Sequence, residues 1–474
     1  MFKNFLAAIL TVCMTVCISA PAFAKSLYVN SQTGDDSVTY ENNSETRPWR
    51  TIGRAATGST NRSAPNAPQA ARAGDIVQIA AGIYWESGYS NGGRFTVSLN
   101  PANSGTQGNP IIFRGTGAVY VRMLSGFRGG MLGCDNRNYI IWDNFHIDDY
   151  YGGSTSDTGP VIFSGGAQHC QIINSDIKGH PGTYYHGYPT FGGNYRGISI
   201  EPADHIVVRN NRIYQFRGGQ NEAGVMTYDS NDNIIENNEF FDNGQAVFIK
   251  GIHTGRTQAR NIIRKNLVRN NNSGIRVLGS TDAQVYQNVI INNTGIGLWA
   301  GFTEAARSKF FNNTLYNNDR AFVPQGGDLV SIEIRNNIFA NNRNAIYNWD
   351  MSNPSGQDMA YSNNVYYGNN THANYESGGS ISFSNWQSTY RLDLNSLTSN
   401  PAFVNTGDGD FRLQATSPAR NLGVDYLDLN MNGQTTDTIP AGAYVTGNEV
   451  IGRLSSSAPA AAPSAPTGIT TEVR

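Results

Sequence analysis

Residues 260–281, RNIIRKNLVRNNNSGIRVLGST, and residues 282–301, DAQVYQNVIINNTGIGLWAG, follow one pattern. Each segment holds short runs of alternating apolar residues, which are typical of β-strands, separated by turns rich in Asn and Gly. Asn266 and Asn288 stand at the same place in the two segments, 22 residues apart. The pattern predicts a repeat that is built from strands alone.

The same pattern extends to both sides of this pair. Further copies are HIVVRNNRIYQFRGGQNEAGVMTYDSN (205–231), DNIIENNEFFDNGQAVFIKGIH (232–253), ARSKFFNNTLYNNDRAFVPQGG (306–327) and SIEIRNNIFANNRNAIYNWD (331–350). One column is Asn in every copy, in steps of 22 to 28 residues: Asn211, Asn238, Asn266, Asn288, Asn313, Asn337 and Asn364. An Asn at a recurring bend can hydrogen-bond the next Asn and the turn backbone, so we expect this column to be structural.

A strand-only repeat of this length predicts an all-β fold, a right-handed parallel β-helix. A single coil has no core of its own and must stack on its neighbours. A β-propeller would need four strands in a longer repeat. We place the β-helix at residues 75–370.

Caps are expected at both ends, because an open coil end exposes unpaired strand edges. We assign residues 25–74 to an N-terminal cap with a short helix around Thr51–Ala56, and residues 371–453 to a C-terminal capping region. The opening segment and NPAFVNTGDGDFRLQATSPARNLG (400–423) are similar to the ends of secreted β-helix carbohydrate enzymes. Residues 454–474, rich in Ser, Ala and Pro, predict a disordered tail.

The first 24 residues, MFKNFLAAILTVCMTVCISAPAFA, predict a secretory signal. Lys3 supplies the positive start, an apolar run follows, and Ala22-Phe23-Ala24 is an A-x-A-type cleavage site, so the mature chain would begin at Lys25. No later stretch approaches the roughly 18 apolar residues of a membrane helix. We therefore expect a secreted or periplasmic protein without a membrane span.

The amino-acid composition indicates which partners and which cysteine states can be expected. The net charge is −2, and only 15% of the residues are charged, which gives no reason to expect a nucleic-acid partner. Cys13 and Cys17 would leave with the signal. Cys134 and Cys170 remain; they can pair in an oxidising compartment or stay as two small buried side chains. We expect a monomer, as is common among solenoids of this kind.

One strand of each repeat carries the candidate site. We align these strands from Ile198, Val225, Val247, Ile275 and Ile296, and strand alternation then sends the second and fourth residues outward. The second column is Ser199, Met226, Phe248, Arg276 and Gly297. The fourth column is Glu201, Tyr228, Lys250, Leu278 and Trp299. Aromatic and charged side chains in register predict a functional cleft.

The residues near this cleft favour a sugar polymer as ligand. Aromatic rings that can stack on sugar rings are Trp299, Phe248, Tyr228, Tyr184 and Tyr185. Arg256, near the edge of the cleft, is the candidate contact for an anionic group. The expected substrate is an acidic, uronate-containing polysaccharide.

Such a polymer can be cut by β-elimination, in which a base removes the C5 proton after the neighbouring carboxylate has been neutralised. Lys250 is the candidate base, since the nearby Arg276 cation favours its neutral form. Arg276 is the candidate for stabilising the charge that develops on the carboxylate. Tyr228 or His253 can supply the proton for the leaving oxygen.

A lysine on one coil and an arginine on the next, in IKGIH (249–253) and NIIRKNLVRNNNSGIRVLGS (261–280), resemble the chondroitinase-B and alginate lyase family. The resemblance implies the same roles for Lys250 and Arg276. The chain departs from the family at Asn243 and Gln245, where the family has an acidic pair, and at Gly251, where it has serine.

Three alternatives stay open. Asp204, Asp229, Asn231 and Asp232 can form an oxygen-rich calcium site like that of the β-helix pectate lyases. Glu201 and Asp229, on adjacent coils, can be the acid and base of a glycoside hydrolase. A non-catalytic protein that binds or assembles exopolysaccharide would use the aromatic rings alone.

Overall fold

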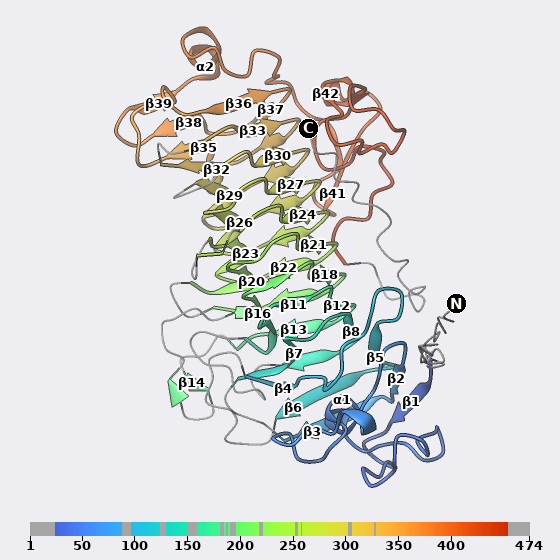
Figure 1. Ribbon diagram of the computed structural model, residues 1–474. Coiled ribbons are helices and arrows are strands. Elements are labelled where there is room, and N and C mark those ends of the chain that lie inside the picture. Colours follow the sequence, from blue (N-terminus) through green and yellow to red (C-terminus); the bar gives the residue numbers. More distant parts are fainter. Residues whose placement is uncertain are drawn as a thin grey trace, which may run out of the picture.

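The computed structural model describes residues 24–87, 96–123, 129–148, 159–180, 184–185, 188–189, 196–217, 221–251, 255–256, 258–301, 306–326 and 329–453. Their strands stack coil upon coil into one elongated parallel β-helix (Figure 1). The prediction of an all-β, right-handed parallel β-helix is confirmed. The predicted signal up to residue 23 and the tail from residue 454 lie outside the described residues.

The coils build three long sheets, which we name A, B and C in the order that the chain visits them. Within the described residues the sheets hold 12, 11 and 12 strands, respectively. Sheet A consists of β1 (Ser26–Val29), β2 (Ile76–Ile79), β5 (Ile111–Gly115), β8 (Ile140–Asp143), β12 (Gln171–Ile173), β18 (Val207–Arg209), β21 (Ile234–Glu236), β24 (Ile262–Arg264), β27 (Gln284–Tyr286), β30 (Lys309–Phe311), β33 (Ile332–Arg335) and β36 (Met359–Ser362). Sheet B consists of β3 (Gly82–Glu86), β6 (Val119–Met123), β9 (His146–Asp148), β13 (Asp176–Lys178), β19 (Arg212–Tyr214), β22 (Glu239–Phe241), β25 (Leu267–Arg269), β28 (Val289–Ile291), β31 (Thr314–Tyr316), β34 (Ile338–Ala340) and β37 (Val365–Tyr367).

Sheet C carries the candidate site. It consists of β4 (Val97–Leu99), β7 (Gly130–Asp135), β10 (Val161–Ser164), β16 (Arg196–Ile200), β20 (Ala223–Thr227), β23 (Gln245–Ile249), β26 (Ser273–Leu278), β29 (Ile296–Gly301), β32 (Arg320–Gln325), β35 (Asn344–Asn348), β38 (Thr371–Tyr375) and β39 (Gly379–Ile381). All its neighbouring strands are parallel except β38 and β39, which are antiparallel.

Smaller elements lie in the turns and at the ends. They are β11 (Ala167–Gln168), β14 (Tyr184–Tyr185), β15 (Tyr188–Pro189), β17 (Ala203–Asp204), β40 (Phe403–Asn405), β41 (Asp410–Leu413), β42 (Gly423–Val424), β43 (Thr438–Ile439), α1 (Ile52–Thr57), α2 (Phe383–Ser388), η1 (Ala67–Gln69) and η3 (Pro418–Asn421). None of the helices in the described ranges is long and apolar enough to cross a membrane.

The predicted asparagine column is a continuous ladder at the bend between sheets A and B. All seven side chains are fully buried. The Oδ1 of Asn266 accepts hydrogen bonds from the backbone N and the Nδ2 of Asn238 at 2.9 and 3.1 Å, and this pairing repeats from coil to coil. The residue before each ladder Asn, such as Asn237 (φ 54°) or Asn312 (φ 51°), is left-handed, which Asn tolerates better than most residues.

A second asparagine ladder follows the bend between sheets B and C. Its members stand five residues after the first ladder's, at Asn243, Asn271, Asn293, Asn318, Asn342 and Asn369. Asn243 Nδ2, for example, donates to Asn271 Oδ1 at 3.0 Å. Two parallel columns of amides therefore flank the strands of sheet B, one at the bend before each strand and one at the bend after it.

The N-terminal end is closed by the short helix α1, whose cap residue Thr51 accepts a hydrogen bond from Arg54 N. The fully buried Glu86 accepts hydrogen bonds from Ile52 N and Gly53 N at 2.7 and 3.1 Å. Strand β1 already pairs in parallel with β2, so sheet A begins at residue 26, within the segment assigned to the cap.

The C-terminal end folds back along the coils (Figure 1). We name residues 400–453 the C-terminal strap. The left-handed residues that precede the first ladder bind it: Asn336 Nδ2 donates to Val424 O at 2.7 Å, and Asn312 Nδ2 donates to Pro440 O at 3.0 Å. At its end, Arg453 Nη1 pairs with Asp176 Oδ2 at 2.8 Å. The strap thus covers the outer side of sheet B from β37 to β13.

Cys134 and Cys170 are both buried and free. Burial raises the pKa of the Cys134 thiol well above its usual value. Of the two alternatives for this pair, the structure therefore has the small buried side chains and not the disulfide.

Candidate functional site

Four strands in the middle of sheet C hold the candidate site. β16, β20, β23 and β26 pair with Ile198 opposite Val225, Val225 opposite Val247, and Val247 opposite Ile275. This is the register that the sequence predicts, and these four side chains are buried in the core. The outward second column is Ser199, Met226, Phe248 and Arg276.

The prediction was wrong for the next strand, β29. Leu298, not Ile296, lies opposite Ile275. Trp299 therefore faces Arg276, whereas the predicted register had it facing Leu278. The reason is steric. Gly297 takes the place of Gly274 in a crowded position where an added Cβ on Gly297 would lie 2.8 Å from the carbonyl oxygen of Ala321. Aligning the two glycines brings the indole next to the guanidinium.

Arg276 is enclosed by aromatic rings. Its Cζ lies 3.6 Å from the centroid of the Trp299 ring and 4.5 Å from that of the Phe248 ring. Nη1 reaches Gln245 Oε1 at 3.5 Å, while the buried Nε has no hydrogen-bond partner. No carboxylate of the described residues forms an ion pair with Arg276, and burial alone lowers its pKa to about 10. Within the described residues, Arg276 is therefore a partly buried positive charge without a carboxylate partner.

Other arginines on neighbouring coils differ from Arg276 in this respect. Arg269 stacks on the Phe241 ring at the same 4.5 Å, but its Nη2 also pairs with Glu239 at 2.8 Å. Arg264 pairs with Glu236 at 2.6 Å. Stacking alone therefore does not distinguish Arg276; the absence of a carboxylate within the described part of the chain does.

Lys250 stands directly after strand β23, where its backbone N donates to Thr227 O at 3.1 Å. Its Nζ lies 5.2 Å from the centroid of the Tyr228 ring and 5.6 Å from that of the Phe248 ring. Lys250 and Arg276 thus approach the same phenylalanine ring from neighbouring coils. Gly251, which follows the lysine, has a left-handed backbone (φ 112°).

An apolar layer supports these two cations. Met226, Phe248 and Tyr228 are 0%, 1% and 8% exposed, respectively, and Trp299 packs against them while remaining partly exposed. Phe248, a candidate sugar contact, is therefore a buried support. Tyr228, a candidate proton donor, is also largely buried, and its ring lies 5.1 Å from the Arg196 guanidinium. Trp299 is the ring of this cluster that a sugar can reach.

Glu201 lies in a buried ion pair. Its Oε2 is 3.1 Å from Arg196 Nη1, which also donates to Ser199 Oγ at 2.8 Å. Arg196 and Glu201 are 0% and 2% exposed. Asp229 is fully buried with a left-handed backbone (φ 49°). Neither carboxylate is open to solvent, as the acid and base of a hydrolase would need to be.

The candidate calcium ligands do not form one oxygen-rich cluster. Asp204 Oδ2 pairs with Arg256 Nη2 at 2.8 Å, and Asp204 Oδ1 accepts from Asn231 N at 2.8 Å. Asp232 is held by both Nε and Nη2 of Arg260, at 2.7 and 2.6 Å. Among the residues described, no group of three or more His, Cys, Asp or Glu side chains is arranged to hold a metal ion. These residues do not fit a calcium ion, and Arg256 is engaged with Asp204.

Three predicted residues cannot be placed in the site. His253 lies outside the described residues, and only the backbone of Tyr184 and Tyr185, in β14, is described.

The aromatic face continues beyond Trp299 to residues that sequence reasoning missed. Trp299 Nε1 donates to Gln325 Oε1 at 2.9 Å, and its ring makes an edge contact with Trp349 at 5.1 Å between centroids. Arg320 lies 4.2 Å from the Tyr347 ring. The signal was present in NAIYNWD (344–350), where Tyr347 and Trp349 alternate like the outward residues of the earlier strands.

With this geometry in hand, the comparisons identify the architecture. The chain matches the family model described as the right handed beta helix region over residues 154–306 and 196–358. A search of curated protein sequences gave no match.

Among solved structures, the pectate lyase Pel9A superposes with a TM-score of 0.53 at 14% identity, covering 89% of this chain and 96% of that chain. The XylC structure in complex with xylose has a TM-score of 0.46 at 12% identity, covering 81% of this chain and 88% of that chain. At such identities the likeness to Pel9A establishes a shared β-helix fold.

Proposed function

We propose that this protein is a secreted polysaccharide lyase that binds an acidic, uronate-containing polysaccharide on the outward face of sheet C and cleaves it by β-elimination. The observation that carries the proposal is the guanidinium of Arg276, which lies between Trp299 and Phe248 and has no carboxylate partner among the described residues. A buried charge without a counter-ion is costly unless a ligand supplies the counter-ion. A carboxylate is the natural partner, because a guanidinium binds it through paired hydrogen bonds.

The aromatic neighbours favour a sugar as the carrier of that carboxylate. The partly exposed Trp299 offers an apolar face beside the guanidinium, and Trp349 and Tyr347 extend it along the axis of the coils. A polymer that runs along this axis would place successive sugar rings on successive coils. One uronate carboxylate would then meet Arg276.

In the proposed reaction Lys250 acts as the base. In its neutral form, Nζ takes the C5 proton of the uronate, the C5–H electron pair forms the C4=C5 double bond, and the C4–O bond breaks. The leaving oxygen takes up a proton, from Tyr228, His253 or water. Arg276 binds the carboxylate whose negative charge grows during this step, so that one arginine serves the neutralising role without a metal ion.

The test is incubation with a panel of uronate polymers, read by the ultraviolet absorbance of the unsaturated product. We expect Lys250→Ala to lose about two to four orders of magnitude in turnover, the usual share of a positioned base. Arg276→Ala should lose comparable activity and also weaken binding. A chelator should leave the wild-type rate unchanged, since the described carboxylates do not assemble a calcium site.

Matched controls separate site effects from general damage. Arg269→Ala removes an arginine with the same 4.5 Å stacking distance but with its own carboxylate, and Lys309→Ala removes a lysine from sheet A. Both should keep wild-type turnover. Cleavage without an unsaturated product would refute elimination, and full activity in Lys250→Ala would refute the role of this lysine.

A further inference from the structure

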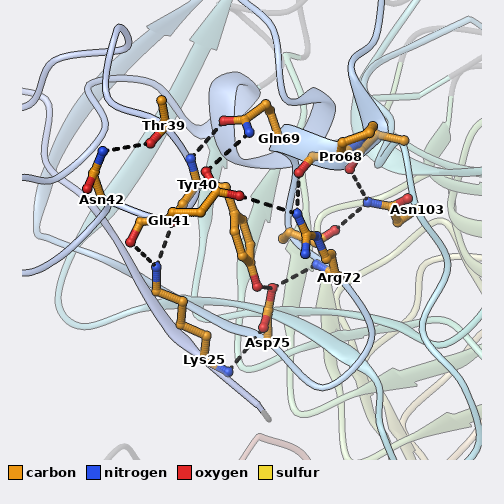
Figure 2. A network of polar contacts seen from close by, with 12 residues as sticks. Lys25, Thr39, Tyr40, Glu41, Asn42, Pro68, Gln69, Arg72, Asp75 and Asn103 are labelled. Carbon is orange, nitrogen blue, oxygen red and sulfur yellow. Dashed lines mark hydrogen bonds and ion pairs between the residues drawn. The ribbon is translucent and has the colours of Figure 1, made fainter. Parts of the chain in front are cut away.

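Asp75 is a buried carboxylate in the N-terminal cap, far along the chain from the candidate site. It is 2% exposed, and it accepts hydrogen bonds from Tyr40 OH (2.8 Å), Arg72 N (2.8 Å) and Lys25 N (3.1 Å). Figure 2 shows these groups converging on it. No Lys, Arg or His side chain of the described residues forms an ion pair with Asp75, although buried charges in proteins are normally paired.

Lys25 is fixed against Asp75 through its backbone. Its carbonyl oxygen accepts from Ile76 N at 3.0 Å, which starts the parallel pairing of β1 with β2. Its Nζ turns away and donates to Tyr40 O and Glu41 O at 2.6 and 3.1 Å. The lysine side chain therefore does not neutralise Asp75; the atom that faces the carboxylate is the main-chain nitrogen.

The sequence places a processing site at this nitrogen, because Ala22-Phe23-Ala24 ends an apolar leader directly before Lys25. We propose that hydrolysis of the Ala24–Lys25 peptide bond makes Lys25 the amino terminus of the mature protein, and that its α-ammonium group is the counter-ion of Asp75. A peptidase adds water across the bond, leaving a carboxylate on Ala24 and an ammonium group on Lys25. An amide N–H thereby becomes a charged donor in the same place.

The surrounding groups are compatible with this charge. The Arg72 guanidinium lies 4.0 Å from the centroid of the Tyr40 ring and 3.8 Å from Glu41 Oε1, so Glu41 offsets this side-chain cation. The Lys25 ammonium lies 4.9 Å from the same ring. Together with Asp75 and Tyr40, these are the titratable and charged groups of the described residues whose contacts link them to Lys25, Tyr40 or Asp75. Burial and Asp75 raise the pKa of the Tyr40 hydroxyl, which keeps Tyr40 a neutral donor.

The geometry also sets an order of events. A peptidase must hold the residues on both sides of the bond in an accessible, extended form. In the closed cap, however, Lys25 is held on both sides of its backbone, because its N donates to Asp75 and its carbonyl oxygen accepts from Ile76 N. Cleavage therefore precedes closure of the cap, and closure then protects the new terminus.

The experiment compares two chains that end at Arg474, one beginning with a free amine at Lys25 and one with Gly-Ser placed before Lys25. The first readout is the pKa of the α-amine, measured by the pH dependence of its acylation followed by mass spectrometry of the N-terminal peptide. We expect the free Lys25 amine to titrate about one unit or more above the ordinary value of about 7.7–8.0. At neutral pH this corresponds to acylation about tenfold slower than in Asp75→Asn.

The second readout is the thermal midpoint. The chain with the free Lys25 amine should unfold at a higher temperature than the Gly-Ser chain. A group whose pKa is raised on folding stabilises below its unfolded pKa and loses that contribution as pH rises through the folded value. The difference should therefore be present at pH 7 and vanish towards pH 10.

Asp75→Asn should abolish the difference between the two chains. Asp36→Asn is the matched control, because Asp36 is another cap carboxylate that accepts backbone N–H groups, from Arg50 and Thr51, and it should leave the difference intact. An ordinary α-amine pKa, or a midpoint difference that persists in Asp75→Asn, would overturn the proposal. So would an exported protein whose N-terminal peptide begins elsewhere than at Lys25.

Discussion

Replacing Asn266 with leucine perturbs the first ladder where it is continuous on both sides. The Asn266 side chain takes part in four hydrogen bonds: Oδ1 accepts from N and Nδ2 of Asn238 at 2.9 and 3.1 Å, and Nδ2 donates to Ile235 O and Asn288 Oδ1 at 2.9 and 3.0 Å. Leucine fills nearly the same volume but can make none of them.

The expected loss follows from which groups keep a partner. Asn238 Nδ2 still donates to Val208 O at 2.9 Å, and Asn288 Oδ1 still accepts from the backbone N of residue 266 at 3.0 Å. The buried backbone N–H of Asn238 loses its acceptor, and Ile235 O loses a donor. Each unsatisfied buried group costs about 1–3 kcal/mol, so for these two groups we expect the free energy of unfolding to fall by about 2–6 kcal/mol.

Urea unfolding, followed by circular dichroism and by tryptophan fluorescence, measures this loss from the midpoint and the slope of the transition. Asn272→Leu, at an exposed position of the same coil, is the control and should change the free energy by at most about 0.5 kcal/mol. Equal midpoints for Asn266→Leu and Asn272→Leu would show that the buried amides do not stabilise the coils, and the reasoning would fail.

Three further changes have defined outcomes. Lys250→Arg should lower turnover by about two to four orders of magnitude, nearly as much as Lys250→Ala, because arginine keeps its proton near neutrality; substantial activity in the product assay would contradict this. Burial lowers the pKa of His372 to about 3, so the wild type should lose stability as pH falls from about 6.5 to 3, where the unfolded chain binds the proton first. His372→Leu should reduce that loss, and parallel stability curves for the two proteins would count against it. Deleting residues 400–474 should uncover Val289 and Ile291, lower the thermal midpoint and increase binding of a hydrophobic dye, whereas an unchanged midpoint would show that the strap adds no stability.

The repeating parts of the fold could be predicted because every repeat must satisfy the same local backbone and hydrogen-bonding requirements. A buried Asn after a left-handed residue is needed at every bend, so the column from Asn211 to Asn364 is visible in the sequence itself. The second ladder could have been found in the same way, since Asn243 and its equivalents stand a constant five residues after the first. The register of β29 was also encoded, in the shared glycines Gly274 and Gly297.

The properties of the site depended on partners that no local pattern specifies. Arg256 and Asp204 are 52 residues apart, and their pairing removes two predicted ligand contacts at once. Arg196, in strand β16, forms a buried ion pair with Glu201, which directly follows that strand. Arg276, by contrast, has no carboxylate partner among the described residues. Which arginine is compensated and which is not follows from packing between coils, and the sequence pattern is silent on it.

The C-terminal strap limits how this solenoid can evolve in length. Glu449, which accepts from Gln287 Nε2 at 3.4 Å, and Arg453, which reaches Asp176, stand four positions apart in the chain. The coils that they contact, those of β27 and β13, are four steps apart along the axis. At about 4.8 Å per coil the four steps amount to roughly 19 Å, whereas four extended residues span about 14 Å and the arginine side chain makes up the rest. A coil duplicated between β13 and β27 would pull Arg453 away from Asp176, while one added before β13 would leave every strap contact in place. Duplication of a coil on the N-terminal side of β13 is therefore compatible with the strap contacts, whereas duplication of a coil that the strap covers is not.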